Sequence, residues 1–282
     1  MCIRDSNKLV LGTVQFGCQY GINSAGRPDE KTVLEILDLA YHSGITNLDT
    51  SSAYGNAEYI LGKVLSASDS SFQIISKYPE SGKSVATVLD QTLTDLHVSS
   101  VYGYLLHHFR VYQNNPEIWK EFLDLKERGK LKKIGFSLYS PSELEILLTD
   151  DVPFDLVQFP YNVFDRQFEP YLELLHKRGV EIHVRSTFLQ GVFFMVRERL
   201  PEKLKPLAPY LTKLDDYAQA TDMTVAEVAL NFNLQNPFID GVLIGVDSVG
   251  QLQDNLRNIS ERKVELSIDV KEKELLNPGN WK

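Results

Sequence analysis

Four side chains within the first 107 residues are of types that exchange protons: the acid Asp49, the phenol Tyr54, the amine Lys77 and the imidazole His107. Asp49, Lys77 and His107 each end a short apolar run that is typical of a buried strand, and Tyr54 lies in a small polar loop after the first run. Asp49 alone would equally suit the cap of a helix that begins near Asn56. Ionisable groups at three consecutive strand ends, with the tyrosine beside them, favour a site for chemistry.

The segments that position these groups alternate regularly between predicted strands and predicted helices. Continuous apolar runs indicate the strands, and apolar residues at helical spacing indicate the helices. The predicted strands cover residues 9–13, 45–49, 72–76, 104–107, 133–137, 155–159, 180–184 and 241–244, and the predicted helices cover 32–42, 57–65, 84–96, 117–128, 142–148, 169–178, 213–220, 225–235 and 249–258. Because a helix separates each strand from the next, the strands must form a parallel sheet.

Eight such units in roughly 250 residues predict an α/β fold of the closed (β/α)8 TIM-barrel type rather than an open sheet. Residues 7–282 contain no linker rich in Pro, Gly or Ser, so we expect one domain over this range, with residues 1–6 as a non-native or disordered extension. The C-terminal ends of barrel strands converge on one mouth. This topology would bring the four ionisable groups into a single pocket.

The composition narrows the class of protein further. The formal net charge is −9 with acids and bases interspersed, which argues against the clustered basic face of a nucleic-acid-binding protein. No run approaches the ~20 apolar residues of a membrane helix, and the N-terminus lacks the apolar core of a signal peptide. The two cysteines, Cys2 and Cys18, indicate neither a metal cluster nor a disulfide framework. We therefore expect a cytoplasmic protein, either a monomer or a weak homo-oligomer, without nucleic-acid, membrane or metal binding.

The order of these motifs resembles that of the aldo-keto reductases over nearly the whole chain. The matching segments are Asp49-Thr-Ser-Ser-Ala-Tyr54-Gly, Ser76-Lys77, Leu105-Leu-His107, Gly135-Phe-Ser137, Gln158-Phe-Pro-Tyr-Asn162, and Ile244-Gly-Val-Asp-Ser248 with Asn255. The resemblance implies reversible hydride transfer between a nicotinamide cofactor and the carbonyl of a small molecule, without metal or flavin. It implies that Tyr54 is the general acid and that Lys77 lowers the pKa of the phenol. Asp49 would pair with Lys77, and His107 would donate a hydrogen bond to the carbonyl oxygen.

Further positions match residues that hold the dinucleotide in this family. Ser137 and Gln158 match the residues that bind the carboxamide of the nicotinamide, and Asn162 lies just beyond them. The turn after the last predicted strand leads into a helix whose N-terminal amides suit a phosphate group. The residues implied in cofactor binding are Ser137, Gln158, Asn162, Arg185, Ser186, Gly245, Val246, Ser248, Gln251, Asp254 and Asn255.

The resemblance implies NADP(H) rather than NAD(H). Many members of the family grip the 2′-phosphate of NADPH with basic residues at positions that are Gly245 and Gln251 in this chain. Arg257 or Lys263 would have to supply the missing positive charge.

Two other departures from the family pattern concern the nicotinamide end. Arg185 replaces the tyrosine that often stacks on the nicotinamide, and Leu138 replaces an asparagine. The family's N-terminal hairpin, which closes the barrel bottom, has almost no chain from which to form. Arg185, together with His183 and Tyr20, suggests a polar mouth and hence a small polar or sugar-like carbonyl or alcohol as substrate.

Two other functions remain open from the sequence. A metal-dependent barrel hydrolase would usually carry a His-x-His pair on its first strand, whereas residues 9–13 offer no ligand. A regulatory or sensing subunit would bind the nicotinamide cofactor with little or no turnover. The complete set of four ionisable groups favours the enzyme.

Overall fold

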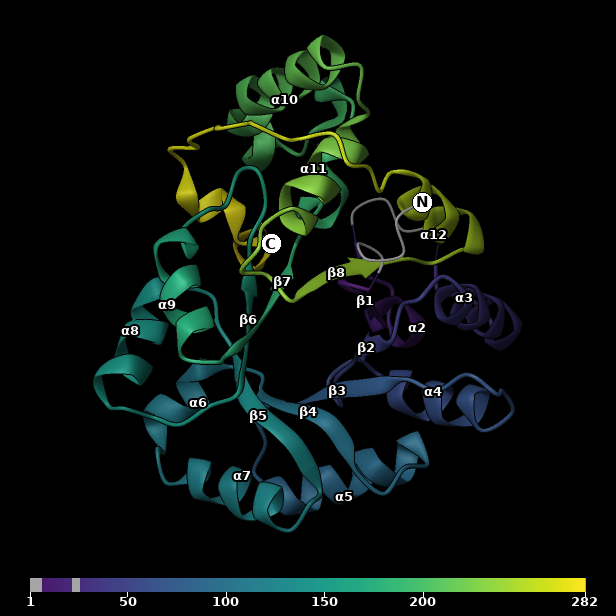
Figure 1. Ribbon diagram of the computed structural model, residues 1–282, viewed down its shortest axis with the longest axis vertical. Coiled ribbons are helices and arrows are strands. Elements are labelled where there is room, and N and C mark those ends of the chain that lie inside the picture. The colour runs from purple at the N-terminus through teal and green to yellow at the C-terminus, as the bar shows by residue number, and fades with distance from the viewer. Residues whose placement is uncertain (1–6, 22–25, 282) are drawn as a thin grey trace.

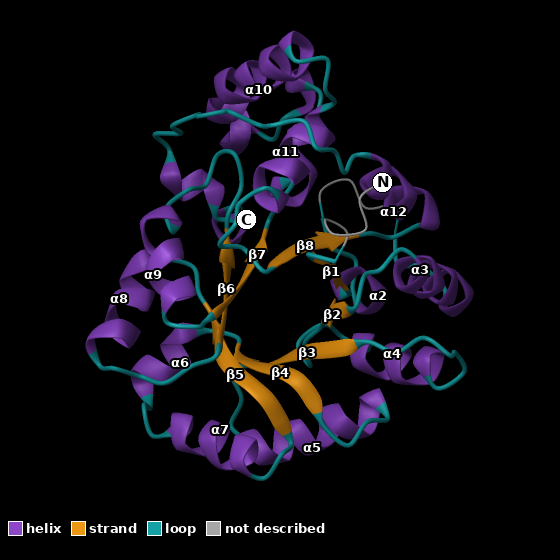
Figure 2. Ribbon diagram, in the orientation of Figure 1, coloured by secondary structure: helices purple, strands orange, loops and turns teal. Residues whose placement is uncertain are grey.

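Eight parallel strands close into a barrel in the order in which they occur in the chain (Figure 2). The computed structural model describes residues 7–21 and 26–281. The strands are β1 (Leu9–Gly12), β2 (Asn47–Asp49), β3 (Gln73–Tyr78), β4 (Val101–Leu106), β5 (Leu131–Ser137), β6 (Leu156–Pro160), β7 (Glu181–Arg185) and β8 (Gly241–Gly245). The predicted (β/α)8 barrel is confirmed, and the extension expected over residues 1–6 lies outside the described residues.

Helices surround the barrel on its outer side (Figure 1). They are α2 (Val14–Gly17), α3 (Glu30–His42), α4 (Ala57–Leu65), α5 (Val85–Leu96), α6 (Phe109–Asn114), α7 (Ile118–Glu127), α8 (Pro141–Thr149), α9 (Leu172–Lys177), α10 (Ala208–Ala220), α11 (Val225–Leu234) and α12 (Val249–Arg257). The short helices α2 and α6 were not predicted, because too few turns are present to show a helical period. Three helices begin after a serine or threonine, the residue types that favour helix N-termini. The side chains of Ser84, Thr224 and Ser248 each accept a hydrogen bond from a backbone N–H in the first turn of the helix that follows.

The interior of the barrel changes from apolar to polar toward the C-terminal ends of the strands. One small cluster of buried residues contains Ile75, Leu105 and Leu156. Two positions after these residues come Lys77, His107 and Gln158. Side chains two positions apart on a strand point to the same face, so each polar group lies one level above an apolar one. The apolar level supports the polar groups and separates them from the barrel bottom.

A polar cluster occupies the N-terminal end of the barrel. Glu181 accepts hydrogen bonds from Lys133 and from Tyr102, and its other oxygen lies 2.7 Å from Nε2 of His183. Burial opposes the charge on Glu181, but these donors outweigh it and lower the pKa of the carboxyl to about 2. The prediction that His183 contributes to the mouth is wrong. Glu181, His183 and Arg185 share one face of β7 at rising levels, so only Arg185 reaches the mouth.

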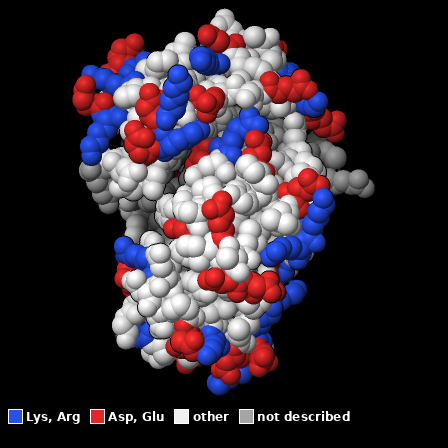
Figure 3. All heavy atoms as spheres, turned by 90° about the vertical axis from the view of Figure 1, so that its left-hand side faces the viewer, with Lys and Arg blue, Asp and Glu red and all other residues white. Residues whose placement is uncertain are grey.

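Charged residues of both signs are mixed over the outer helices. Figure 3 shows them interspersed on the side of the molecule that lies to the left in Figure 1. Exposed pairs one helical turn apart contribute to this mixture, for example Lys177 with Glu173 on α9 and Lys120 with Glu117 near α7. Within the described residues, no helix combines the length and apolarity needed to cross a bilayer.

Candidate active site

A buried ion pair lies at the C-terminal ends of β2 and β3. Nζ of Lys77 is 2.5 Å from Oδ1 of Asp49 and 3.0 Å from the carbonyl oxygen of Thr50. Nε2 of Gln158, on β6, donates to Oδ2 of Asp49 at 2.8 Å. Asp49 and Lys77 are only 2% and 1% exposed, and burial lowers the pKa of Lys77 while Asp49 opposes that shift. The predicted pairing of these two residues is present, and Gln158 orients the carboxylate from the far side of the barrel.

Tyr54 lies over this pair, in the loop between β2 and α4. Nζ of Lys77 is 5.2 Å from the centroid of the phenol ring, and the ring meets that of His107 edge-on at 5.7 Å. Burial, followed by the nearby Asp49 carboxylate, raises the pKa of Tyr54, and the Arg185 guanidinium acts in the opposite direction. The lowering of that pKa by Lys77 stays a prediction. Arg185 is a cation that favours the phenolate.

The imidazole of His107 is held by a serine that the sequence did not single out. Oγ of Ser51 lies 3.1 Å from Nδ1 of His107 and accepts a hydrogen bond from the backbone N–H of Ala53. The Ser51 hydroxyl can therefore donate to Nδ1, which leaves the proton of a neutral ring on Nε2. Burial, and next the charge of Lys77, lower the pKa of His107 to about 2, so the ring is neutral at physiological pH. The only sequence signal for Ser51 is its position between Asp49 and Tyr54.

Close backbone contacts hold the Tyr54 loop in place. A Cβ added at Gly17, in α2, would lie 1.8 Å from the carbonyl oxygen of Tyr54 and 2.6 Å from the amide nitrogen of Ala57. Gly55 has a φ of +60°, and a Cβ there would lie 2.7 Å from the oxygen of Gly17. The loop and α2 can thus approach this closely only because both positions are glycine. Gly17 is a second positioning residue that sequence reasoning missed.

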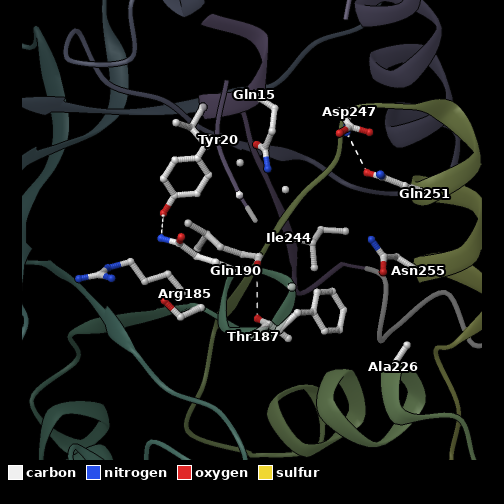
Figure 4. Close-up of a pocket in the computed structure, with 18 of the residues that line it drawn as sticks. Gln15, Tyr20, Arg185, Thr187, Gln190, Ala226, Ile244, Asp247, Gln251 and Asn255 are labelled. Carbon is white, nitrogen blue, oxygen red and sulfur yellow. Dashed lines mark hydrogen bonds between the residues drawn. The ribbon is translucent and has the colours of Figure 1, made fainter. Parts of the chain in front are cut away.

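A cavity of about 760 Å³ extends from Asp49 and Tyr54 to α12, a volume within the usual range of ligand pockets. Figure 4 shows Tyr20 and Arg185 on one side of it and Asp247, Gln251 and Asn255 on the other, with Gln15 between them. The loop after β7 forms part of the wall, and Nε2 of Gln190 in this loop donates to the hydroxyl of Tyr20 at 2.6 Å. This contact links the loops that follow β1 and β7.

The wall carries two features that point to a bound ligand. Oε1 of Gln15 is buried and has no hydrogen-bond partner among the described residues, although buried polar atoms are normally paired. Ser186, Leu189 and Gln190 have φ values between 47° and 63°, and such strained backbone clusters at functional sites. Neither feature could be found from sequence, because both depend on how the loops pack.

The cavity brings together most, but not all, of the predicted cofactor residues. Ser137, Asn162, Val246 and Ser248 do not line it. The side chain of Asn162 bonds the carbonyl oxygen of Ser186 and two backbone amides of its own loop, Val246 is fully buried in the core, and Ser248 caps α12. The predicted residues that line the cavity are Gln158, Arg185, Ser186, Gly245, Gln251, Asp254 and Asn255. Among the described residues, no three His, Cys, Asp or Glu side chains gather so as to hold a metal ion.

Comparison with known proteins extends this picture. The chain is 24% identical to the uncharacterized oxidoreductase YqkF of Bacillus subtilis, over 92% of this chain and 90% of that protein. It is 27% identical to L-galactose dehydrogenase of Arabidopsis thaliana, over 90% and 86% of the two chains, and 26% identical to L-glyceraldehyde 3-phosphate reductase of Escherichia coli, over 80% and 78%. The fold matches that of a holo-form aldo-keto reductase from Bacillus halodurans with a TM-score of 0.73 and 22% identity, over 95% and 90% of the two chains. The model of the aldo/keto reductase family matches residues 8–270, and the chain therefore belongs to this family of NAD(P)-dependent carbonyl oxidoreductases.

Proposed function

We propose that the protein interconverts an aldehyde or ketone and the corresponding alcohol, with Tyr54 as the general acid and base. One observation carries this proposal. The phenol, the neutral imidazole of His107 and the Asp49–Lys77 pair converge at one end of a cavity that is large enough for a dinucleotide. Hydride addition to a carbonyl needs a proton and hydrogen-bond donors at the oxygen, and this end of the cavity offers both.

The residues along the cavity fit a nicotinamide dinucleotide. The buried Oε1 of Gln15 is an acceptor in need of a donor, and the N-terminus of α12, a helix of nine residues, can bind a phosphate group. Gly245 leaves room for the side chain of Gln15 in the cavity wall, because a Cβ at position 245 would lie 2.4 Å from Nε2 of Gln15. When bound, the reduced nicotinamide supplies the hydride that adds to the carbonyl carbon.

The protein's own residues complete the reaction at the carbonyl oxygen. Because the pKa of Tyr54 is raised, the phenol carries its proton at neutral pH. As negative charge develops on the oxygen, Oη of Tyr54 transfers the proton to it, and the Arg185 guanidinium favours the phenolate that remains. Nε2 of the neutral His107 donates a hydrogen bond to the same oxygen. The ion pair of Lys77 and Asp49 packs beneath the phenol ring and supports it.

The proposed reaction is tested by mixing purified protein with NADPH or NADH and a panel of aldehydes and following the absorbance of the nicotinamide. Turnover of at least one carbonyl compound is expected. Tight dinucleotide binding without turnover on any carbonyl would instead favour a sensing subunit. Hydrolysis that a chelator stops would favour a metal-dependent hydrolase.

The Gly17→Ala variant is expected to fold but to lose about 10²-fold in kcat. The added methyl group must push the Tyr54 loop away, and a misplacement of about 1 Å at a catalytic group costs this much. The matched control is Gly82→Ala, because a Cβ at Gly82 meets nothing within 4 Å. Steady-state kinetics and thermal unfolding of both variants check the prediction. Equal kcat in the two variants would contradict it.

For the substrate we propose a small polar or sugar-like carbonyl compound. The guanidinium of Arg185 stacks on Tyr139 at 4.1 Å and donates to the carbonyl oxygen of Leu138 at 3.1 Å. It forms no ion pair with a described residue, so its remaining N–H groups can bind substrate oxygens. The names of two relatives, an L-galactose dehydrogenase and an L-glyceraldehyde 3-phosphate reductase, also point to sugar-like compounds.

Replacing Arg185 by Met is expected to raise KM for aldoses about tenfold or more and to leave KM for apolar aldehydes nearly unchanged. A hydrogen bond to a charged group is worth about 1.5–3 kcal/mol, and an apolar aldehyde makes no such bond. The control is Arg128→Met, which removes an exposed guanidinium that pairs with Asp124 at the end of α7. Wild-type preference for long apolar aldehydes over aldoses would refute the proposed substrate class.

A further inference from the structure

A buried carboxyl group lies outside the barrel wall, where α4 and α5 cover β3 and β4 (Figure 1). It belongs to Glu58, which is in the first turn of α4 and only 5% exposed. Burial raises the pKa of this carboxyl group, because the interior disfavours its charged form. An apolar side chain would fill the space between a helix and a sheet without the cost of removing a carboxyl group from water. The proposed reaction does not yet account for this group.

Two hydroxyl groups hold the carboxyl group of Glu58. Oγ of Ser76, on β3, donates to Oε1 of Glu58, and Oγ1 of Thr92, on α5, donates to Oε2 at 3.1 Å. Ser76 and Thr92 are both fully buried. Buried polar groups whose hydrogen bonds are all made favour one arrangement of the elements that carry them. These bonds therefore fix the first turn of α4 against β3 and α5.

The bond between Glu58 and Ser76 connects the two segments that carry Tyr54 and Lys77. Ser76 directly precedes Lys77 on β3, and successive side chains of a strand point to opposite faces. Ser76 thus faces α4 while Lys77 faces the interior of the barrel. On the other segment, the N–H of Ala57, the first residue of α4, donates to the carbonyl oxygen of Tyr54 at 3.1 Å. A shift of α4 along the sheet would therefore move the phenol relative to the amine.

We propose that Glu58 is a positioning residue that, through Ser76, fixes the phenol of Tyr54 relative to the amine of Lys77. The inference rests on the proposed function. Glu58 does not line the cavity that Asp49 and Tyr54 share, so it touches neither the carbonyl compound nor the dinucleotide. Its loss should therefore slow the chemical step and leave the affinity for the dinucleotide unchanged.

The test measures the chemical step in single turnover, by nicotinamide absorbance at saturating dinucleotide and carbonyl compound, and the dinucleotide Kd by fluorescence titration. Glu58→Met keeps the length of the side chain but loses both carboxyl oxygens. Its chemical step should be about 10-fold to 10²-fold slower, since a misplacement of about 1 Å costs up to this much, with an unchanged Kd. Glu58→Gln should keep most of the rate, because the amide can accept from one hydroxyl and donate to the other.

A carboxylate between two outer helices supplies the matched control. Glu121, on α7, accepts a hydrogen bond from the N–H of Val85, the first residue of α5, at 2.8 Å. Glu121→Met therefore removes a contact between helices without touching the bond from α4 to β3. This variant should keep the wild-type rate of the chemical step.

A double variant separates positioning from a general loss of structure. In Tyr54→Phe protein no phenol hydroxyl remains to be misplaced, so adding Glu58→Met should hardly change the residual rate. Such non-additivity is the signature of two residues that act through one another. A general loss of folded protein would instead lower the rate by the same factor in both backgrounds, and thermal unfolding measures that loss directly.

A wild-type rate in Glu58→Met would overturn the inference. A loss of the same factor in both backgrounds, or a loss in the Gln variant as large as in the Met variant, would overturn it as well. Each of these results leaves the proposed reaction standing, whereas a wild type that turns over no carbonyl compound would overturn the proposed function itself. If the Met variant does not fold, Ser76→Ala removes the same bond from β3 and should slow the chemical step in the same way.

Discussion

Tyr54→Phe is expected to lower kcat for carbonyl reduction by about 10²–10⁴-fold, the usual contribution of a positioned general acid. The change removes one hydroxyl from a side chain whose raised pKa keeps it protonated and whose ring centroid lies 5.2 Å from the Lys77 amine. The ring contact with His107 is retained, so the fold and the affinity for the dinucleotide should change little. Steady-state kinetics, together with dinucleotide titration and thermal unfolding, measure these quantities separately.

A matched variant separates the role of Tyr54 from a general effect of losing a phenol near the mouth. Tyr20→Phe removes the hydroxyl that accepts from Gln190 at the other side of the cavity. This variant should keep most of its kcat. If Tyr54→Phe turned over substrate at the wild-type rate, the assignment of the general acid would be wrong.

Lys77→Met is expected to destabilise the fold by about 3–5 kcal/mol, because it leaves the Asp49 carboxylate as an uncompensated charge in the interior. The double variant Asp49→Asn with Lys77→Met should be more stable than Lys77→Met alone, since it removes that charge. Equilibrium unfolding in urea gives both free energies of unfolding. Both variants should also lose activity, because the support beneath Tyr54 changes.

An exposed ion pair supplies the control for this effect. On α9, Nζ of Lys177 lies 2.7 Å from Oε1 of Glu173, and the two side chains are 69% and 60% exposed. Lys177→Met should therefore change the free energy of unfolding far less than Lys77→Met does, because solvent screens an exposed ion pair. A similar loss in Lys77→Met and Lys177→Met would show that burial does not strengthen the dependence on the partner.

Local patterns were enough to predict the barrel and the convergence of Asp49 and Lys77 at its mouth, whereas the pairing of these two residues beneath Tyr54 was implied by the family resemblance. Apolar runs and helical spacing depend on neighbours in the chain, and the rule that strand ends share one mouth converts positions along the sequence into proximity in space. The same rule does not say how far a given residue of a strand lies from the mouth of the barrel. His183 and Arg185 are both polar residues of β7, yet His183 pairs with Glu181 at the barrel bottom and only Arg185 lines the cavity.

The sequence by itself determined the fold class and the four groups that meet at the mouth, because periodicity and residue type carry that information. Only the tertiary structure decided what surrounds each group. It placed Ser51 against His107, Gly17 against the Tyr54 loop and the Arg185 charge near the phenol. Protonation and orientation depend on burial and on charges from segments far apart in the chain, and such contacts exist only once the barrel has closed.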